Sequence, residues 1–363
     1  MQTYHVNVPN NRSLRLSQSD YDVNYQIDAY SQALEERLSV KADIYSLKSI
    51  ESLQTNSPTA NRLLILDESH LAYILKDESH PEKFLTICIF NHRASEVLHK
   101  ITMTRGRIDL FDKISDDLLC FVEFFYGSNS YKVEIIDWKK GRIVESISRP
   151  QIQGYAESVA MGKMAIFLVR TIPCFYMLLG ECELLREYAY EVGSGSVITN
   201  GRFLDHEKGA CLDLKTGNVQ YVPKEMASVL SKSSPPTMLD PNTIVVCLSG
   251  NVFVSYDVNQ LNQISERVMS TDNLYEHVTG FCGYLIAIET KAEVEHGDIV
   301  IFDRDLRIVK RISGMYNNLH VDCNYRQLFL FDTNSHIHVY EIEKKLKIKQ
   351  EGKFCDVEVI TFI

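Results

Sequence analysis

The sequence predicts an all-β fold made of repeated four-stranded units, and three observations lead to this prediction. Short runs rich in Val, Ile, Phe, Tyr and Leu alternate with polar residues and stop at Asp, Asn, Gly or Ser, which is the pattern of half-buried strands. One strand–turn–strand unit returns along the chain at a regular spacing. Helical periodicity is found in one segment, residues 25–39, where Ile27, Tyr30, Leu34 and Leu38 recur at spacings of three and four.

The individual strands are clearest after residue 61. Four of them read as alternating or continuous apolar runs bounded by turn residues, at residues 131–136, 298–302, 327–331 and 336–340. A second strand precedes or follows each of them within a few residues, as antiparallel pairing requires.

The repeated unit is a strand that ends in a large apolar residue, then an acidic or amide residue, a tight polar turn and a second apolar strand. Its acidic or amide members are Asn91, Asp137, Asp213, Asp257, Asp303 and Glu341, with a further member expected near residues 178–181. The average step is about 42 residues, and a period of roughly 40 to 45 with four strands per unit is typical of propeller blades. The sequence therefore predicts a seven-bladed β-propeller of four-stranded antiparallel blades over residues 62–363.

The two ends of the chain are expected to behave differently. A leftover apolar strand, residues 356–363, is expected to close the ring by pairing into the first blade, because two blades would otherwise have free edges. Residues 1–61 lack a clear repeat and are expected to form a short N-terminal arm, partly helical or lending a strand from residues 3–8 or 41–47. Two interpretations of the arm stay open: it packs against the propeller, or it is a docking segment for a larger partner. A two- or three-layer β fold, such as a double sandwich, stays open as an alternative.

The repeat resembles the WD-repeat superfamily of β-propellers over about residues 62–363. In that family the third strand of a blade often ends in Trp-Asp, and the matching pairs here are Ile136-Asp137, Tyr256-Asp257, Phe302-Asp303 and Tyr340-Glu341. The Trp is never present at these positions, Trp138 follows its Asp instead of preceding it, and the family's Gly-His pair is absent. The resemblance implies a propeller that holds other proteins together.

Composition excludes several classes of protein and indicates the compartment. The 363 residues carry a formal net charge of −10, with 24% charged and 45% hydrophobic residues, which excludes collagen, a coiled-coil rod and wholesale disorder. The nine cysteines are odd in number, never two residues apart and mostly inside apolar runs, so we expect free thiols in a reducing, intracellular compartment, cytoplasmic or nuclear. Neither a secretory signal nor a membrane span is expected, since the most apolar stretch, residues 158–180, contains Lys163, Arg170 and Pro173.

The sequence gives little sign of catalytic chemistry. It lacks a phosphate-binding loop, a dinucleotide fingerprint, a nucleophile elbow and sialidase-type boxes. Asp-Glu-Ser-His occurs at residues 67–70 and 77–80, and His336 and His338 share one face of a strand, but polar turns and surface positions are favoured over a metal site. We therefore predict no catalytic residue, no metal and no cofactor, and expect a protein that is not an enzyme.

The charge pattern is the most informative functional signal. Turns between third and fourth strands fall on one face of a propeller, and those of four contiguous units would form a basic arc. Its residues are Arg93, Lys139, Lys140, Arg142, Arg304, Arg307, Lys344 and Lys345. The opposite face would receive acidic loops with Glu289, Glu293, Glu295 and Asp332.

Two interpretations of the basic arc stay open. It is either a solvated rim, since turns are polar in any case, or a docking surface for an anionic partner. An acidic protein segment is favoured over RNA, because the chain is acidic overall and few aromatic residues accompany the basic ones. The predicted function is an interaction scaffold or adaptor subunit of a multi-protein complex. The alternatives are a propeller enzyme with a site in the central channel and a propeller that binds an anionic, phosphoinositide-bearing membrane surface.

Overall fold

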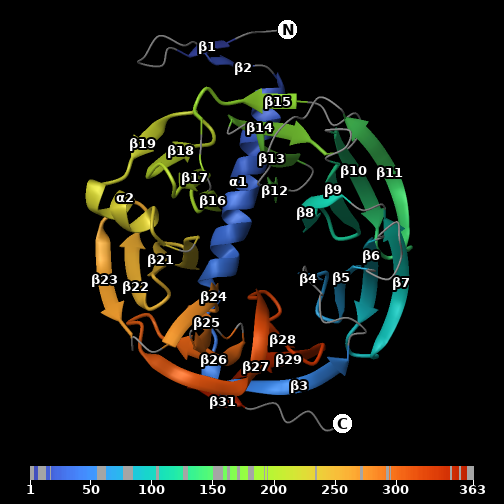
Figure 1. The fold of residues 1–363 in the computed structure, drawn as a ribbon, viewed down its shortest axis with the longest axis vertical. Helices are drawn as coiled ribbons and strands as arrows, with labels where there is room; N and C mark the ends of the chain where they lie inside the picture. The colour runs from blue at the N-terminus through green and yellow to red at the C-terminus, as the bar shows by residue number, and fades with distance from the viewer. Residues whose placement is uncertain are drawn as a thin grey trace.

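A computed structural model describes residues 4–6, 14–16, 18–54, 63–76, 85–103, 106–125, 130–149, 158–161, 164–169, 172–178, 184–191, 193, 195–233, 235–269, 273–291, 294, 296–343, 346–350 and 353–357. Antiparallel sheets follow one another around a ring, and a helix crosses its middle (Figure 1). The predicted all-β propeller architecture is confirmed.

Within the described residues, five four-stranded sheets follow one another in chain order, each running from first to fourth strand without crossover. Blade 1 consists of β4 (Leu63–Ile65), β5 (His70–Lys76), β6 (Leu85–Asn91) and β7 (Glu96–Met103). Blade 2 consists of β8 (Arg107–Lys113), β9 (Leu118–Phe125), β10 (Ser130–Asp137) and β11 (Arg142–Arg149). Blade 3 consists of β12 (Ser158–Met161), β13 (Met164–Val169), β14 (Ile172–Met177) and β15 (Leu184–Glu187).

Blades 4 and 5 have the same plan. Blade 4 consists of β16 (Gly195–Ile198), β17 (Arg202–Asp205), β18 (Ala210–Asp213) and β19 (Val219–Tyr221). The short helix α2 (Lys224–Leu230) then leads to blade 5 and packs Met226 and Leu230 into the seam between the two blades. Blade 5 consists of β20 (Thr237–Asp240), β21 (Thr243–Leu248), β22 (Val252–Asp257) and β23 (Gln263–Val268).

A seven-stranded sheet completes the ring because one strand serves two blades. The first part of β27 (Ile308–Asp322) pairs with β26, and its second part pairs with β28. We call the two parts of this sheet blade 6 and blade 7. Blade 6 adds β24 (Asn273–Phe281), β25 (Tyr284–Lys291) and β26 (Gly297–Phe302). Blade 7 adds β28 (Gln327–Asp332), β29 (His336–Ile342) and β3 (Leu47–Gln54).

The outer strand of blade 7 comes from the N-terminal arm and takes the place expected for residues 346–350. Strand β3 pairs antiparallel with β29 from Leu47 opposite Ile342 to Gln54 opposite His336, so it occupies the outer edge of the last blade. Instead, β30 (Leu346–Gln350), expected to be the fourth strand of this unit, forms a hairpin with β31 (Lys353–Val357). The predicted pairing of residues 356–363 with the first blade falls mostly on residues 358–363, which lie outside the described part of the chain.

The arm also supplies the helix in the middle of the ring. Strands β1 (Tyr4–Val6) and β2 (Leu14–Leu16) pair with each other, and α1 (Gln18–Ser39) follows and contains the predicted helix of residues 25–39. Figure 1 shows α1 lying across the ring from β15 toward β24. Its predicted apolar positions Ile27, Leu34 and Leu38 are buried, and a short 3₁₀ turn (Ile44–Ser46) leads into β3.

The hydrophobic core is divided into clusters that fill the seams between neighbouring blades. The seam between blades 7 and 1 joins the two ends of the ring. There, Phe329 and Val339 from blade 7 pack with Leu71, Tyr73 and Cys88 from blade 1. The ring is therefore closed twice, by β3 in the last blade and by this apolar seam.

Candidate functional site: the turn face

One face of the ring gathers two sets of turns. In an antiparallel four-stranded sheet, the turn between the first and second strands and the turn between the third and fourth strands lie at the same end. Hydrogen bonds between neighbouring blades connect the two kinds of turn. At the first-to-second strand turn of blade 4, Asn200 donates to Asn259 Oδ1 at 3.0 Å and Arg202 donates to the carbonyl of Val258 at 2.7 Å, both in the third-to-fourth strand turn of blade 5. We call this side of the ring the turn face.

The repeated acidic or amide residue of the sequence stabilises the turns on this face. Asp213 Oδ1 accepts hydrogen bonds from the amides of Lys215 and Thr216 at 2.9 and 2.8 Å. Asp257 Oδ1 accepts in the same way from the amides of Asn259 and Gln260, at 2.8 and 2.7 Å. An Asx-type turn of this kind needs a short side chain with an oxygen acceptor. The Asp that resembles the WD-repeat motif is thus explained by turn geometry.

Six basic-arc residues lie in the described part of the chain, and four of them face carboxylates on their own or a neighbouring blade. Lys139 Nζ lies 2.5 Å from Asp117, and Lys140 Nζ lies 2.7 Å from Asp137. Arg304 Nη2 lies 3.2 Å from Asp240 across the seam between blades 5 and 6. The fourth, Arg93, lies 3.8 Å from Glu341 and also donates to a carbonyl of blade 1.

The remaining described members, Arg142 and Arg307, are exposed. Lys344 and Lys345 lie outside the described residues. The turn face therefore carries both signs of charge, because the first-to-second strand turns contribute Asp116 and Asp117 beside the basic third-to-fourth strand turns. Asp116 and Asp117 are visible in the sequence as polar turn residues. The predicted basic arc, however, includes only the turns between third and fourth strands, so these two acids are not part of it.

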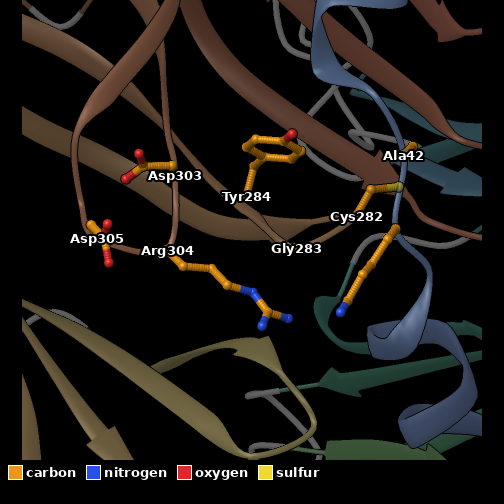
Figure 2. A pocket seen from close by; sticks show the side chains of 8 residues that line it. Ala42, Cys282, Gly283, Tyr284, Asp303, Arg304 and Asp305 are labelled. Atoms are coloured by element: carbon orange, nitrogen blue, oxygen red, sulfur yellow. The ribbon is translucent and has the colours of Figure 1, made fainter.

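A cavity of about 380 Å³ opens beside Arg304. It lies between the segment that follows α1 and two turns of blade 6, and is lined by Lys41, Ala42, Cys282, Gly283, Tyr284, Asp303, Arg304 and Asp305. Figure 2 shows the guanidinium of Arg304 extending toward Gly283, whereas the carboxylates of Asp303 and Asp305 lie on the other side of their loop. Gly283 has φ +83°, and a Cβ there would lie 4.0 Å from Lys41 Cγ, so the lysine stem passes over this turn.

A second cavity of about 380 Å³ lies at the centre of the ring, between α1 and the innermost strands of blades 4 to 7. Leu34, Arg37 and Leu38 of α1 line one side, and His320 and Cys323 are among the strand-side residues. Burial lowers the pKa of His320 to about 4, and its Nε2 atom has no hydrogen-bond partner among the described residues. Helix α1 thus occupies much of the space in which a central-channel site would lie.

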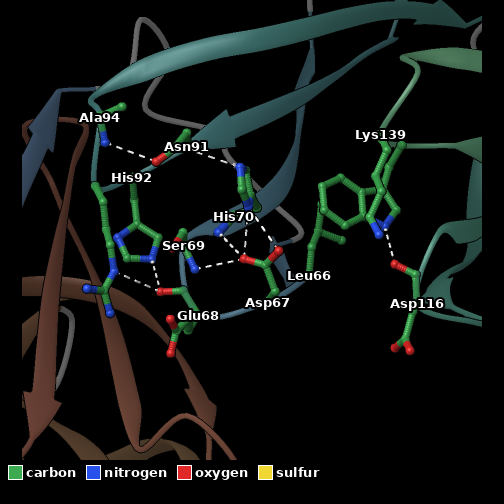
Figure 3. A network of polar contacts seen from close by, with 12 residues as sticks. Leu66, Asp67, Glu68, Ser69, His70, Asn91, His92, Ala94, Asp116 and Lys139 are labelled. Atoms are coloured by element: carbon green, nitrogen blue, oxygen red, sulfur yellow. Dashed lines mark hydrogen bonds and ion pairs between the residues drawn. The ribbon is translucent and has the colours of Figure 1, made fainter.

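The first Asp-Glu-Ser-His segment is a turn of blade 1. Figure 3 shows the Asp67 carboxylate facing Ser69 and His70, whose amides donate to Asp67 Oδ1 at 2.8 and 2.9 Å. The Glu68 carbonyl accepts from His92 at 3.0 Å and from Gln327 of blade 7 at 3.1 Å. Asp67 is therefore engaged in the turn, and no cluster of metal-ligating side chains occurs among the described residues. Residues 77–80 lie outside them.

The predicted acidic face offers few unpaired carboxylates in the described residues. Glu289 accepts hydrogen bonds from Arg311, from Tyr275 at 2.6 Å and from Asn273 at 3.0 Å. The other described member, Asp332, accepts from His338 at 3.0 Å and from two backbone amides of its own turn. Glu293 and Glu295 lie outside the described residues.

Comparisons with known proteins support the propeller fold but do not assign the chain to a family. No protein-family model matches the chain, and no curated protein matches it. Similar solved structures include BamB from Moraxella catarrhalis, with 11% identity, a TM-score of 0.49 and coverage of 81% of this chain and 97% of that one. They also include the β-propeller domain of Cps50 (Swd1) from Myceliophteria thermophila, with 10% identity, a TM-score of 0.54 and coverage of 80% and 98%. The chain has a β-propeller fold.

Proposed function

We propose that the chain is a non-catalytic scaffold or adaptor subunit of an intracellular multi-protein complex. Its turn face docks a partner protein through an acidic segment of that partner. The observation that carries this proposal is the position of α1. A helix in the centre of the ring occupies much of the place where a propeller enzyme would hold its substrate, which favours the turns and the outer strands as binding surfaces (Figure 1).

The docking contacts are best assigned to cations that form no close ion pair within the described part of the chain. Arg142 acts on Asp137 only through its charge, after the nearer Lys140. Arg142 and Arg307 are exposed at the two ends of the basic arc. Lys41 adds a cation beside Arg304 in the cavity of blade 6. A partner carboxylate at these positions gains an ion pair without breaking one, whereas at Lys139 or Lys140 it competes with Asp117 or Asp137.

The membrane-binding alternative has less support. Among the described residues, neither helix has an apolar stretch of the length needed to cross a bilayer. A peripheral, phosphoinositide-binding surface would need several unpaired cations close together, but four of the six described arc residues face carboxylates.

The test is affinity purification of the tagged chain from its native cell, with quantitative mass spectrometry of the proteins that co-elute. The variant Arg142→Glu/Arg307→Glu is compared with Lys291→Glu, which reverses an exposed charge at the far end of β25. We expect a stoichiometric partner set, from which one acidic protein is lost in the double variant and retained in the control. An empty eluate from folded protein contradicts the scaffold, and an unchanged partner set contradicts docking by the basic arc.

A further inference from the structure

Two cysteines occupy equivalent turns of neighbouring blades. Cys282 lies in the turn between β24 and β25 of blade 6, and Cys323 lies in the turn between β27 and β28 of blade 7. They are 41 residues apart, which is one repeat of the propeller. Because adjacent blades place equivalent turns side by side, the two residues meet at the seam.

Each cysteine side chain contacts the backbone of the other cysteine. The amide of Cys282 donates to Cys323 Sγ at 3.4 Å, and Cys282 Sγ donates to the carbonyl of Cys323 at 4.0 Å. A disulfide requires two cysteines whose sulfur atoms can meet without a large backbone movement, and here each sulfur already lies within 4.0 Å of a backbone atom of the other cysteine.

Each cysteine lines a different cavity. Cys282 lies in the wall of the cavity beside Arg304, and Cys323 lies in the wall of the cavity at the centre of the ring. Both residues are otherwise buried, at 3% and 4% exposure. A solute as small as hydrogen peroxide can therefore approach the pair, whereas a protein thiol cannot.

We propose that Cys282 and Cys323 are a modification site for peroxide, at which the two thiols are oxidised to a disulfide that joins blade 6 to blade 7. Cys323 Sγ, as the thiolate, attacks one peroxide oxygen, the O–O bond breaks, and the hydroxide that leaves takes up a proton to become water. Cys282 Sγ then attacks the sulfenic sulfur of Cys323, the S–O bond breaks, and a second water leaves. The two thiols lose two electrons and two protons in total, and one peroxide is reduced to two waters.

The order of attack follows from the amide of Cys282, which donates to Cys323 Sγ and stabilises negative charge on that sulfur. Contacts with the side chain and the amide of Cys282 lower the pKa of the Cys323 thiol, so Cys323 is the attacking thiol and Cys282 the resolving thiol. Burial instead raises the pKa of other cysteines, to about 12 for Cys174 and Cys247 and to about 11 for Cys211. These thiols stay protonated and react slowly with peroxide.

The disulfide would form where the N-terminal arm enters the ring. Ile44 and Leu47 pack in the same cluster as both cysteines, and Lys310 donates to the carbonyls of Ile44 and Leu47 at 3.3 and 3.0 Å. Oxidation would therefore crosslink blades 6 and 7 at the place where the arm packs against both of them. A crosslink across 41 residues also restricts the unfolded chain, which stabilises the folded state.

The experiment treats the reduced full-length chain with one equivalent of hydrogen peroxide, blocks remaining thiols with iodoacetamide in denaturant, and maps the peptides by mass spectrometry. We expect one crosslinked peptide pair containing Cys282 and Cys323, removable with dithiothreitol, and a thermal midpoint raised by about 5 °C. Cys282→Ser should stop at a sulfenic acid that dimedone traps, and Cys323→Ser should show neither product.

The matched control is Cys211→Ser, which removes another buried thiol and should keep the Cys282–Cys323 crosslink. Thermal melts of all reduced variants establish that they fold. Carbamidomethylation of both Cys282 and Cys323 after peroxide treatment of the unmutated chain overturns the proposal. So does a crosslink between other cysteines. Because these two results come from the unmutated chain, they decide the question even if a serine variant fails to fold.

Discussion

The ammonium of Lys139 lies 2.5 Å from the carboxylate of Asp117, which belongs to the neighbouring turn of the same blade. The hydrogen bond from Lys139 to Asp117 raises the pKa of the lysine. Both side chains are exposed, so the pair is a local match of charge on the turn face and contributes little to folding. Its consequence is that Lys139 is less available to a partner than the sequence suggests.

Replacing Asp117 should therefore make the turn face a better acceptor of acidic ligands. In Asp117→Asn the lysine keeps its position but loses its partner, and we expect a fluorescein-labelled octaglutamate peptide to bind roughly two- to three-fold more tightly at low salt. Fluorescence anisotropy measures the binding, and the gain should vanish at high salt. Glu266→Gln removes an equal charge from exposed β23 and should leave binding unchanged. Equal affinities for the two variants would contradict the prediction.

Closure of the ring by β3 gives a second prediction. Deleting residues 1–54 removes β3 and α1, exposes the edge of β29 and empties the centre of the ring, so we expect aggregation or loss of the cooperative melt. Deleting residues 346–363 removes the β30–β31 hairpin and leaves the pairing of β29 with β3 intact. Size-exclusion chromatography and circular dichroism melts distinguish the two truncations. A stable monomer from the first truncation, or collapse of the second, would contradict closure by β3.

The fold was predictable because its signals are local and repeated. The alternation of apolar and polar residues locates strands such as β28 and β29, and the turn-forming Asp213, Asp257 and Asp303 mark the period because each must hold a tight turn. Closure was not predictable in this way. Residues 346–350 read as the fourth strand of the last blade, but α1 carries the N-terminal segment across the ring, and β3 (Leu47–Gln54) pairs with β29 instead.

The candidate site was predictable only in part, because charge on a surface depends on neighbours that are distant in sequence. The basic residues do lie in third-to-fourth strand turns, as the repeat predicts. However, Asp240 faces Arg304 from 64 positions away, in another blade, and the period alone does not reveal such a pair. The contact between Cys282 and Cys323 was missed for a different reason. In the sequence each reads as an isolated buried thiol, although their spacing of one repeat is the available signal.

A third prediction concerns the anchoring of α1. Ile27 is fully buried and packs near Gly201, whereas Tyr25 on the same helix is 69% exposed. Ile27→Ala should lower the free energy of unfolding by about 3 kcal/mol, because it leaves a cavity between α1 and blade 4. Tyr25→Ala is the matched control and should change it little. Urea denaturation measures both. Equal small effects would mean that α1 is not fixed in the ring.

The last prediction uses the network around Glu289. Burial pushes the pKa of its carboxyl upward, but hydrogen bonds from Arg311, Tyr275 and Asn273 outweigh burial and hold it below the ordinary value of 4.5. A carboxylate with a lowered pKa stabilises the fold above the pKa of the unfolded chain. That contribution disappears as the pH falls through the pKa of the folded state.

Glu289→Gln should therefore cost about 2 kcal/mol of unfolding free energy at pH 7, because Arg311 keeps its charge beside a neutral amide. The difference from the unmutated protein should shrink as the pH falls below 4.5, where the native carboxylate also becomes protonated. Urea denaturation between pH 3 and pH 7 measures the difference. Glu276→Gln, at an exposed position of β24 in the same blade, should have little effect at any pH. A difference that stays constant down to pH 3 would assign the role of Glu289 to packing and not to its charge.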